Sequence, residues 1–107
     1  MFTRMVEIRT KPGKAEEFCH KIHHRVLTIL KVQPGFVDEI VLVSETEADR
    51  VVALSFWKTK EDAERYSVEQ YPQIRDLIEN QVHTAPKVHT FKVETSTAHK
   101  IARGKAA

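Results

Sequence analysis

The stretch of residues 50–66, RVVALSFWKTKEDAERY, constrains the fold of this chain more than any other. Its first part, residues 51–57, is apolar at every position except Ser55. Because side chains along a strand alternate between two faces, a strand here carries apolar side chains on both faces. Such strands are typical of sheets that are covered on both sides. The sequence therefore raises the question of what covers each face of the sheet.

The second part of this stretch carries the signals that begin a helix. Thr59 is suited to the N-cap position, and Asp62 places a carboxylate in the first turn, where the helix dipole favours negative charge. The helix is expected to falter over residues 67–71 and to restart at Pro72, since proline suits the first turn of a helix.

The rest of the chain divides into elements of the same two kinds. Strands are predicted from alternation or from apolar runs between turn residues, and helices from apolar residues spaced three and four apart. The first helix has an apolar stripe that includes Phe18, Ile22, Val26 and Ile29, and it ends before the turn at Pro34 and Gly35. The predicted order is strand 2–10, helix 14–32, strand 36–44, strand 51–57, a helix from 60 to before the Ala85-Pro86 break, and strand 87–95.

This order predicts an α+β fold, a ferredoxin-like βαββαβ sandwich with a four-stranded antiparallel sheet and two helices on one face. A chain of 107 residues has nothing left to cover the other face. Roughly six apolar side chains would be exposed there, and each large one contributes about 1.5–3 kcal/mol when buried. The sum rivals the roughly 5–15 kcal/mol that stabilises a whole domain. We therefore expect a homodimer in which the two sheets pack face to face.

Composition and charge narrow the classes of function. The net charge of +2 is too small to indicate a nucleic-acid-binding protein. The single cysteine, Cys19, excludes an internal disulfide framework and a thiolate zinc site. The first ten residues carry charges where a signal peptide needs an apolar core, and no segment approaches membrane-spanning length, so we expect a cytoplasmic protein with no membrane partner. One domain is expected over residues 1–95, followed by a disordered basic tail over residues 96–107.

Two short motifs resemble the antibiotic biosynthesis monooxygenase (ABM) family, and the similarity extends over residues 1–95. They are the turn Pro34-Gly35-Phe36 and the helix start WKTKEDA at residues 57–63. The resemblance implies a dimeric α+β barrel with a cavity between the sheet and the helices of each subunit. In several members that cavity binds a quinol or a polycyclic phenol, and molecular oxygen is inserted without metal or flavin because the electron-rich substrate anion itself reduces oxygen.

For this chain the resemblance implies a cofactor-independent monooxygenase that oxidises a small phenolic or quinol-type molecule with molecular oxygen. No metal-binding or cofactor-binding residue is expected. Members of the actinorhodin pathway type carry an asparagine four residues before the tryptophan, where this chain has Ala53. Haem-degrading members need an asparagine, a tryptophan and a histidine where this chain has Val6, Tyr66 and Asp76, so haem degradation is not expected. The alternative is a non-catalytic dimeric protein that binds a small ligand, or a stress-associated one, with the same cavity.

The candidate catalytic residues are Trp57, Tyr66, His23 and His83. Trp57 matches the family's tryptophan at the end of the third strand, and an indole that lines a cavity can stack on an aromatic substrate and donate one hydrogen bond. Tyr66 is a candidate for orienting a phenol. His23, which flanks the apolar stripe, and His83 are candidates for the base that takes the substrate's proton. Packing roles for the two aromatic residues and surface positions for the two histidines remain the alternatives.

The sequence HKIHH places two further histidines, His20 and His24, four residues apart on one helix face. Such a pair can bind a metal ion. No carboxylate beside them offers an evident third ligand except Glu16, so a solvated surface pair is the interpretation we favour.

Overall fold

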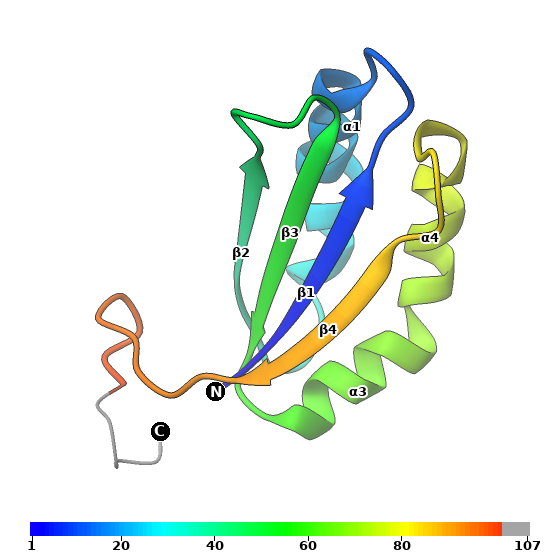
Figure 1. Cartoon of the computed structure of the whole chain (residues 1–107). Coiled ribbons are helices and arrows are strands. Elements are labelled where there is room, and N and C mark those ends of the chain that lie inside the picture. Colours follow the sequence, from blue (N-terminus) through cyan, green and yellow to red (C-terminus); the bar gives the residue numbers. More distant parts are fainter. Residues whose placement is uncertain (102–107) are drawn as a thin grey trace.

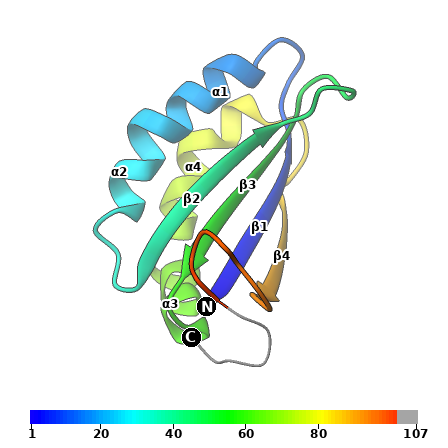
Figure 2. The same ribbon diagram turned by 90° about the vertical axis from the view of Figure 1, so that its left-hand side faces the viewer.

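The structure is a computed structural model that describes residues 1–101. It forms a four-stranded antiparallel sheet with helices on one face only (Figure 1 and Figure 2). The strand order β2-β3-β1-β4 is that of a ferredoxin-like fold, so the predicted fold class is confirmed. Within the described range, no helix has the length and apolar character needed to cross a membrane. The elements are β1 (Phe2–Arg9), α1 (Ala15–Lys21), η1 (Ile22–Val26), α2 (Leu27–Leu30), β2 (Phe36–Val43), β3 (Arg50–Trp57), α3 (Lys60–Glu69), α4 (Tyr71–Ile78), η2 (Glu79–Gln81) and β4 (Lys87–Lys92).

The helix start after β3 is built as its residues indicate. The Thr59 hydroxyl oxygen accepts a hydrogen bond from the backbone N–H of Asp62 at 3.1 Å, and the hydroxyl donates to the Asp62 carboxylate at 2.9 Å. The turn that precedes β2 packs against this cap. Only glycine suits position 35 there, because its φ is +79° and a Cβ would overlap the Asp62 side chain. The turn at Gly35 and the helix start at Thr59, the two motifs on which the family resemblance rests, thus contact each other. The helical segment breaks at Gln70, and Pro72 lies in the first turn of α4, as expected.

The first helical segment differs from the regular α-helix that the spacing predicts. Its middle, η1, is a π-helix, and four buried side chains follow one another at a constant spacing of four: Phe18, Ile22, Val26 and Leu30. In an α-helix of about 3.6 residues per turn, such residues drift around the axis. The wider π turn reduces the drift. Leu30 is therefore buried, whereas the expected stripe residue Ile29 is only partly buried.

The two faces of the sheet differ in what covers them. On the face toward the helices, Ile8, Val51 and Trp57 are between 0% and 3% exposed. On the opposite face, which we call the open face, Leu42 of β2 and Phe91 of β4 are 50% and 49% exposed. The helices of this chain thus cover one face, and the other face is left largely uncovered.

A short turn after β4 covers one end of the open face. Residues 96–101 form a loop closed by reciprocal backbone hydrogen bonds of 2.8 and 2.7 Å between Ser96 and Ile101. The ring of His99 lies 5.1 Å from the ring of Phe56, and its Nε2 lies 3.6 Å from an Asp38 carboxylate oxygen. These residues belong to the segment for which disorder is expected from residue 96, and β4 ends at Lys92, earlier than predicted. The remainder of the expected tail, residues 102–107, lies outside the described residues.

Candidate functional site

A small cavity lies between the covered face of the sheet and the helices. It has a volume of about 40 Å³. Its polar lining residues come from the strands β1, β2 and β3 and from the helices α3 and α4, and its remaining walls are aliphatic. The polar residues are Arg4, Glu39, Ser55, Tyr66 and Tyr71, and the aliphatic ones include Val6, Ile8, Ile22, Val26, Ile74 and Ile78.

Arg4 brings a positive charge into this cavity. It alternates along β1 with Val6 and Ile8, and like them it points toward the helices, with only 4% of its surface exposed. The guanidinium carbon lies 5.2 Å from the ring centre of Tyr66 and 4.6 Å from that of Tyr71, which is the geometry of a cation–π interaction. Burial lowers the pKa of Arg4, and the two tyrosines partly oppose this shift. An arginine remains protonated at neutral pH in such a setting.

Glu39 brings a titratable carboxyl group to the same cavity. It lies on β2 opposite Ser55 of β3, on the helix side of the sheet. Burial raises the pKa of Glu39 to about 7, and the neighbouring Asp38 adds to the shift. A carboxyl group with a pKa near the working pH is suited to take and return a proton. Sequence analysis did not single out Glu39 or Arg4.

Tyr66 lines the cavity, and Trp57 lies behind it. The indole of Trp57 is fully buried, its ring stacks on that of Tyr66 at 4.8 Å and 30°, and its N–H donates to the Ser55 hydroxyl at 2.9 Å. Trp57 is not among the residues that line the cavity. Its N–H is already used, so Trp57 positions Tyr66 and Ser55 in place of the direct substrate contact expected from sequence. Burial raises the pKa of Tyr66 above its usual range, so its hydroxyl stays protonated.

The two histidines expected to supply a base lie outside the cavity. His23 is exposed on η1, and its ring meets that of His24 edge-on at 4.9 Å. The π turn contributes to this placement, because it changes the face on which residues beside the stripe point. His83 is exposed beyond η2, with its backbone N–H bonded to the Arg9 carbonyl at 2.7 Å. Of the four candidate residues, the structure brings Trp57 and Tyr66 together and leaves both histidines apart.

The histidine pair on the first helix is also on the surface. The rings of His20 and His24 stack at 5.8 Å with an angle of 10°. Among residues 1–101, no group of three or more histidine, cysteine, aspartate or glutamate side chains is arranged to hold a metal ion.

The chain belongs to the antibiotic biosynthesis monooxygenase family, because the model of that family matches residues 1–73. Among solved structures, SnoaB, a cofactor-independent oxygenase from Streptomyces nogalater, is 13% identical, with 90% of this chain and 95% of that chain covered at a TM-score of 0.73. A Nitrosomonas europaea protein assigned to antibiotic biosynthesis monooxygenases is 21% identical, with 87% and 98% covered at a TM-score of 0.71.

A conserved protein from Methanosarcina mazei is 18% identical, with 86% of this chain and 92% of that chain covered at a TM-score of 0.69. Identities this low establish a shared fold and leave the chemistry to be argued from the site. Among curated protein sequences, none matches this chain.

Proposed function

We propose that this protein is a cofactor-independent monooxygenase that oxidises a small phenolic or quinol-type molecule with molecular oxygen. The observation that carries the proposal is the pairing, in one apolar cavity, of aromatic walls from Tyr66 and Tyr71 with the Glu39 carboxyl group. A phenol in this cavity meets an apolar lining that includes two tyrosine side chains, and a base to receive its proton. Membership of the family and the fold shared with SnoaB support the same reaction class.

The proposed reaction begins when the Glu39 carboxylate accepts the phenolic proton. The electron-rich phenolate transfers one electron to oxygen, and the two radicals combine at a ring carbon that bears hydrogen, forming a carbon–oxygen bond. The Glu39 carboxyl group returns its proton to the peroxide oxygen, and the resulting hydroperoxide loses water as the carbon–hydrogen bond breaks, which leaves a carbonyl group. One phenol and one oxygen molecule give one quinone and one water, so atoms and electrons balance without another reductant. Tyr66, held by Trp57, orients the ring.

The size of the cavity restricts the substrate. At about 40 Å³ it holds only a few water molecules, because a single water needs about 10–15 Å³ by the same measure. A cavity that binds one benzene ring measures about 150 Å³. A substrate therefore enters only as lining side chains move aside, and a single ring requires far less movement than a polycyclic one. We accordingly propose a substrate with one aromatic ring.

The test is oxygen consumption by purified, metal-stripped protein with single-ring phenols and hydroquinones. The wild type is expected to consume oxygen and form quinone in equal amounts. Glu39→Gln is expected to lower kcat about 100-fold or more, in the range that general bases contribute, whereas the exposed control Glu45→Gln leaves kcat unchanged. Trp57→Phe and Tyr66→Phe are expected to raise KM or lower kcat several-fold. Undiminished turnover by Glu39→Gln would contradict the assignment of the base.

A second candidate function is non-catalytic binding of a small ligand. The small volume of the cavity favours it, as does Ala53, which lines the cavity where some family members have a polar residue. Binding of single-ring phenols without oxygen consumption under any of these conditions would establish this second function. The polar lining argues against non-catalytic binding of an apolar ligand, because such binding does not require an arginine, a carboxyl group and two tyrosines in the cavity.

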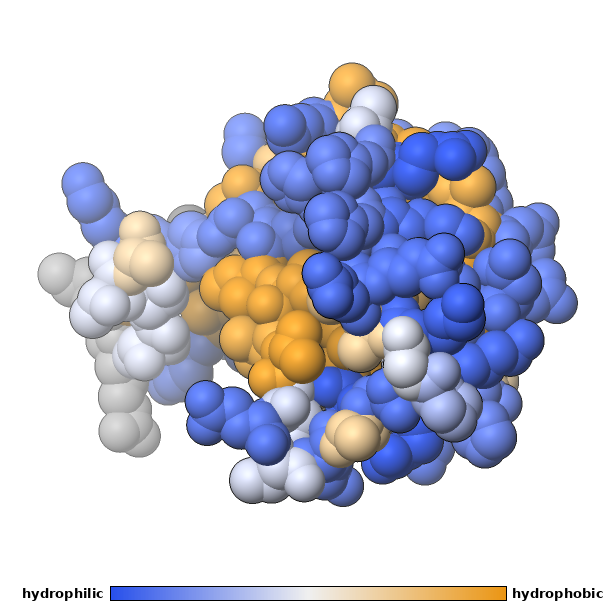
Figure 3. All heavy atoms as spheres, turned by 90° about the horizontal axis from the view of Figure 1, so that it is seen from above, coloured by the Kyte–Doolittle hydropathy of each residue, from blue (hydrophilic) through white to orange (hydrophobic). Residues whose placement is uncertain are grey.

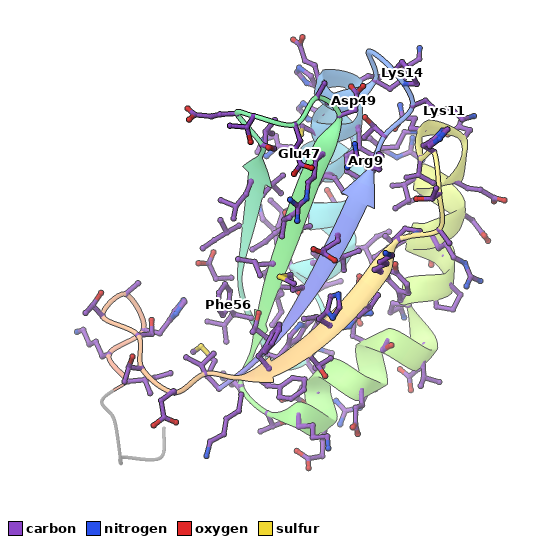
Figure 4. All side chains as sticks on the ribbon, viewed as in Figure 1. Arg9, Lys11, Lys14, Glu47, Asp49 and Phe56 are labelled. Carbon is purple, nitrogen blue, oxygen red and sulfur yellow. The ribbon has the colours of Figure 1, made fainter. Side chains whose placement is uncertain are left out.

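We also propose that the protein acts as a homodimer joined through the open face. Figure 3 shows an apolar patch at the surface among otherwise hydrophilic residues. Ile40, Leu42 and Phe91 of the open face are 39% to 50% exposed. Apolar surface of this kind usually marks an interface. The charged residues that are labelled in Figure 4 gather at the upper end of the molecule, away from Phe56.

A further inference from the structure

Arg4 is a buried cation whose charge is not matched by a carboxylate. Within residues 1–101, no ion pair involves its guanidinium, although its side chain is almost entirely buried. Its partners are the faces of Tyr66 and Tyr71. Interaction with ring faces offsets only part of the free energy that is lost when a charge leaves water. The folded chain therefore holds an arginine that an anion would stabilise further.

The nearby carboxyl groups do not fill this role. Glu39 shares the cavity, but a guanidinium beside it would lower its pKa, and that pKa is raised by burial and by Asp38. On the other side of Arg4 a groove runs along α3, where Glu64 is paired with Lys60 at 3.8 Å. Neither acidic group that lines the two hollows forms an ion pair with Arg4 in the described part of the chain: no ion pair involves Glu39, and Glu64 is paired with Lys60.

We infer that the cavity binds its ligand through an anionic oxygen carried by an aromatic ring, a carboxylate or a phenolate, held by the Arg4 guanidinium. The aliphatic walls from Ile22, Val26 and Ile74 favour an apolar body. The guanidinium favours an anionic oxygen, and it can donate two parallel hydrogen bonds to a carboxylate. This inference rests on the proposed function for the choice of cavity, and it assigns the charge of the substrate.

The assignment gives Arg4 and Glu39 separate tasks. A phenol that transfers its proton to Glu39 acquires a negative charge, and Arg4 stabilises that charge inside the cavity. A substrate that already carries a ring carboxylate uses Arg4 for binding and leaves Glu39 free to deprotonate a hydroxyl group elsewhere on the ring. In both cases the anion is the species that lies next to the cation.

The test is binding to the full chain under argon, where no turnover occurs. Benzoate is compared with the neutral, similarly shaped benzamide by calorimetry, and para-nitrophenol reports a bound phenolate through its visible absorbance. Wild type is expected to bind at least one of the two anions tenfold or more tightly than its neutral counterpart. Preference for benzoate alone assigns a carboxylate, and a rise in nitrophenolate absorbance on binding assigns a phenolate.

Arg4→Met keeps the length of the side chain and removes its charge. It is expected to weaken binding of the preferred anion about 10–100-fold, as loss of a hydrogen bond to a charged group does, and to leave neutral ligands unaffected. Arg4→Lys keeps the charge and is expected to retain part of the preference. Removal of an unpaired buried charge is not expected to lower the melting temperature. If Arg4→Met fails to fold, the wild-type preference together with Arg4→Lys decides the question.

Equal binding of anions and neutral analogues by wild type, or unchanged anion binding by folded Arg4→Met, would overturn the inference. The outcome is separable from that of the proposed function. Anion preference without oxygen consumption on any phenol would leave the anion site standing and remove the monooxygenase. Oxygen consumption with uncharged hydroquinone, without a preference for anions over neutral analogues, would leave the monooxygenase standing and remove the anion site.

Discussion

The two faces of the sheet have similar apolar content in sequence and opposite environments in structure. Along β3, Val51 and Trp57 on the helix side are fully buried, while Val52, Leu54 and Phe56 on the open face are only partly buried. The same strand thus meets a packed core on one side and incomplete cover on the other. The covered face holds the candidate site, and the open face is the surface through which we propose that a second copy binds.

The polar residues follow the same division. On the covered face, Arg4 is buried and Glu39 is partly buried, neither forms an ion pair with another described residue, and both line the cavity. On the open face, the two carboxylate oxygens of Glu7 lie 3.2 Å from a guanidinium nitrogen of Arg50 and 3.1 Å from Nε2 of His89. The polar side chains there are thus paired with one another. Enclosed charges that no neighbour neutralises are typical of functional sites, whereas paired surface charges are typical of a rim.

The largest expected effect is on association through the open face. Leu42→Asp is expected to raise the dissociation constant of the dimer about 100-fold or more, because an unpaired carboxylate would be buried against the partner sheet. Val43→Asp is the matched control, since Val43 is 56% exposed and lies on the helix side of the same strand. Sedimentation equilibrium measures both variants. Equal effects of the two substitutions would remove the distinction between the faces.

A smaller effect is expected on the stability of the covered face. Val51→Ala removes two methyl groups from a fully buried position and is expected to lower the free energy of unfolding by about 2–3 kcal/mol. Its neighbour Val52 offers the same substitution on the open face, where the expected loss is below about 1 kcal/mol at low protein concentration and grows as the dimer forms. Urea unfolding at several concentrations measures the pair. A loss at Val52 that equals that at Val51 and does not depend on concentration would show that the open face is buried within one chain.

The smallest effect is the pH dependence of stability that Glu39 confers, because this side chain is only partly buried and solvent screens its charge. Its pKa in the folded protein, about 7, lies above the ordinary value of 4.5, so the folded state binds more protons than the unfolded state between these values. Stability is therefore expected to fall as the pH rises from 4.5 through about 7 and to change no further above it.

Thermal unfolding from pH 4 to pH 9 would measure this change. The slope of stability against pH is expected to correspond to the uptake of about one proton at most. Glu39→Gln is expected to flatten it between the two pKa values, and Glu45→Gln, an exposed control, is expected to leave it in place. A slope that survives Glu39→Gln would assign the titration to another group.

The fold could be predicted from sequence because its determinants are local and periodic. The apolar run of β3, the Thr59 cap and the turn at Gly35 fix the elements and their order. The π turn of η1 could not be predicted in this way, because the side chains that face the sheet decide it, and helical spacing alone cannot separate Ile29 from Leu30 as the buried residue.

The site could be predicted only in part. Both faces of the sheet are apolar in sequence, so the pattern did not show which face the helices cover, and hence whether Asp38 or Glu39 enters the cavity. Arg4 did leave a signal, since it is the one charge among Phe2, Val6 and Ile8 on an otherwise apolar strand face. His23 and His83 were candidates only because a histidine side chain can act as a base. The ability to act as a base does not predict whether a side chain is buried, so their exposure could not be derived from sequence.

The most direct test of this account is a crystal structure of the wild-type protein grown with the anion that it binds most tightly. The account predicts ligand density between the sheet and the helices, with the anionic oxygen at the Arg4 guanidinium and the ring against Tyr66 or Tyr71. Density against the open face near Phe56 and Leu42, with the cavity still closed, would contradict it.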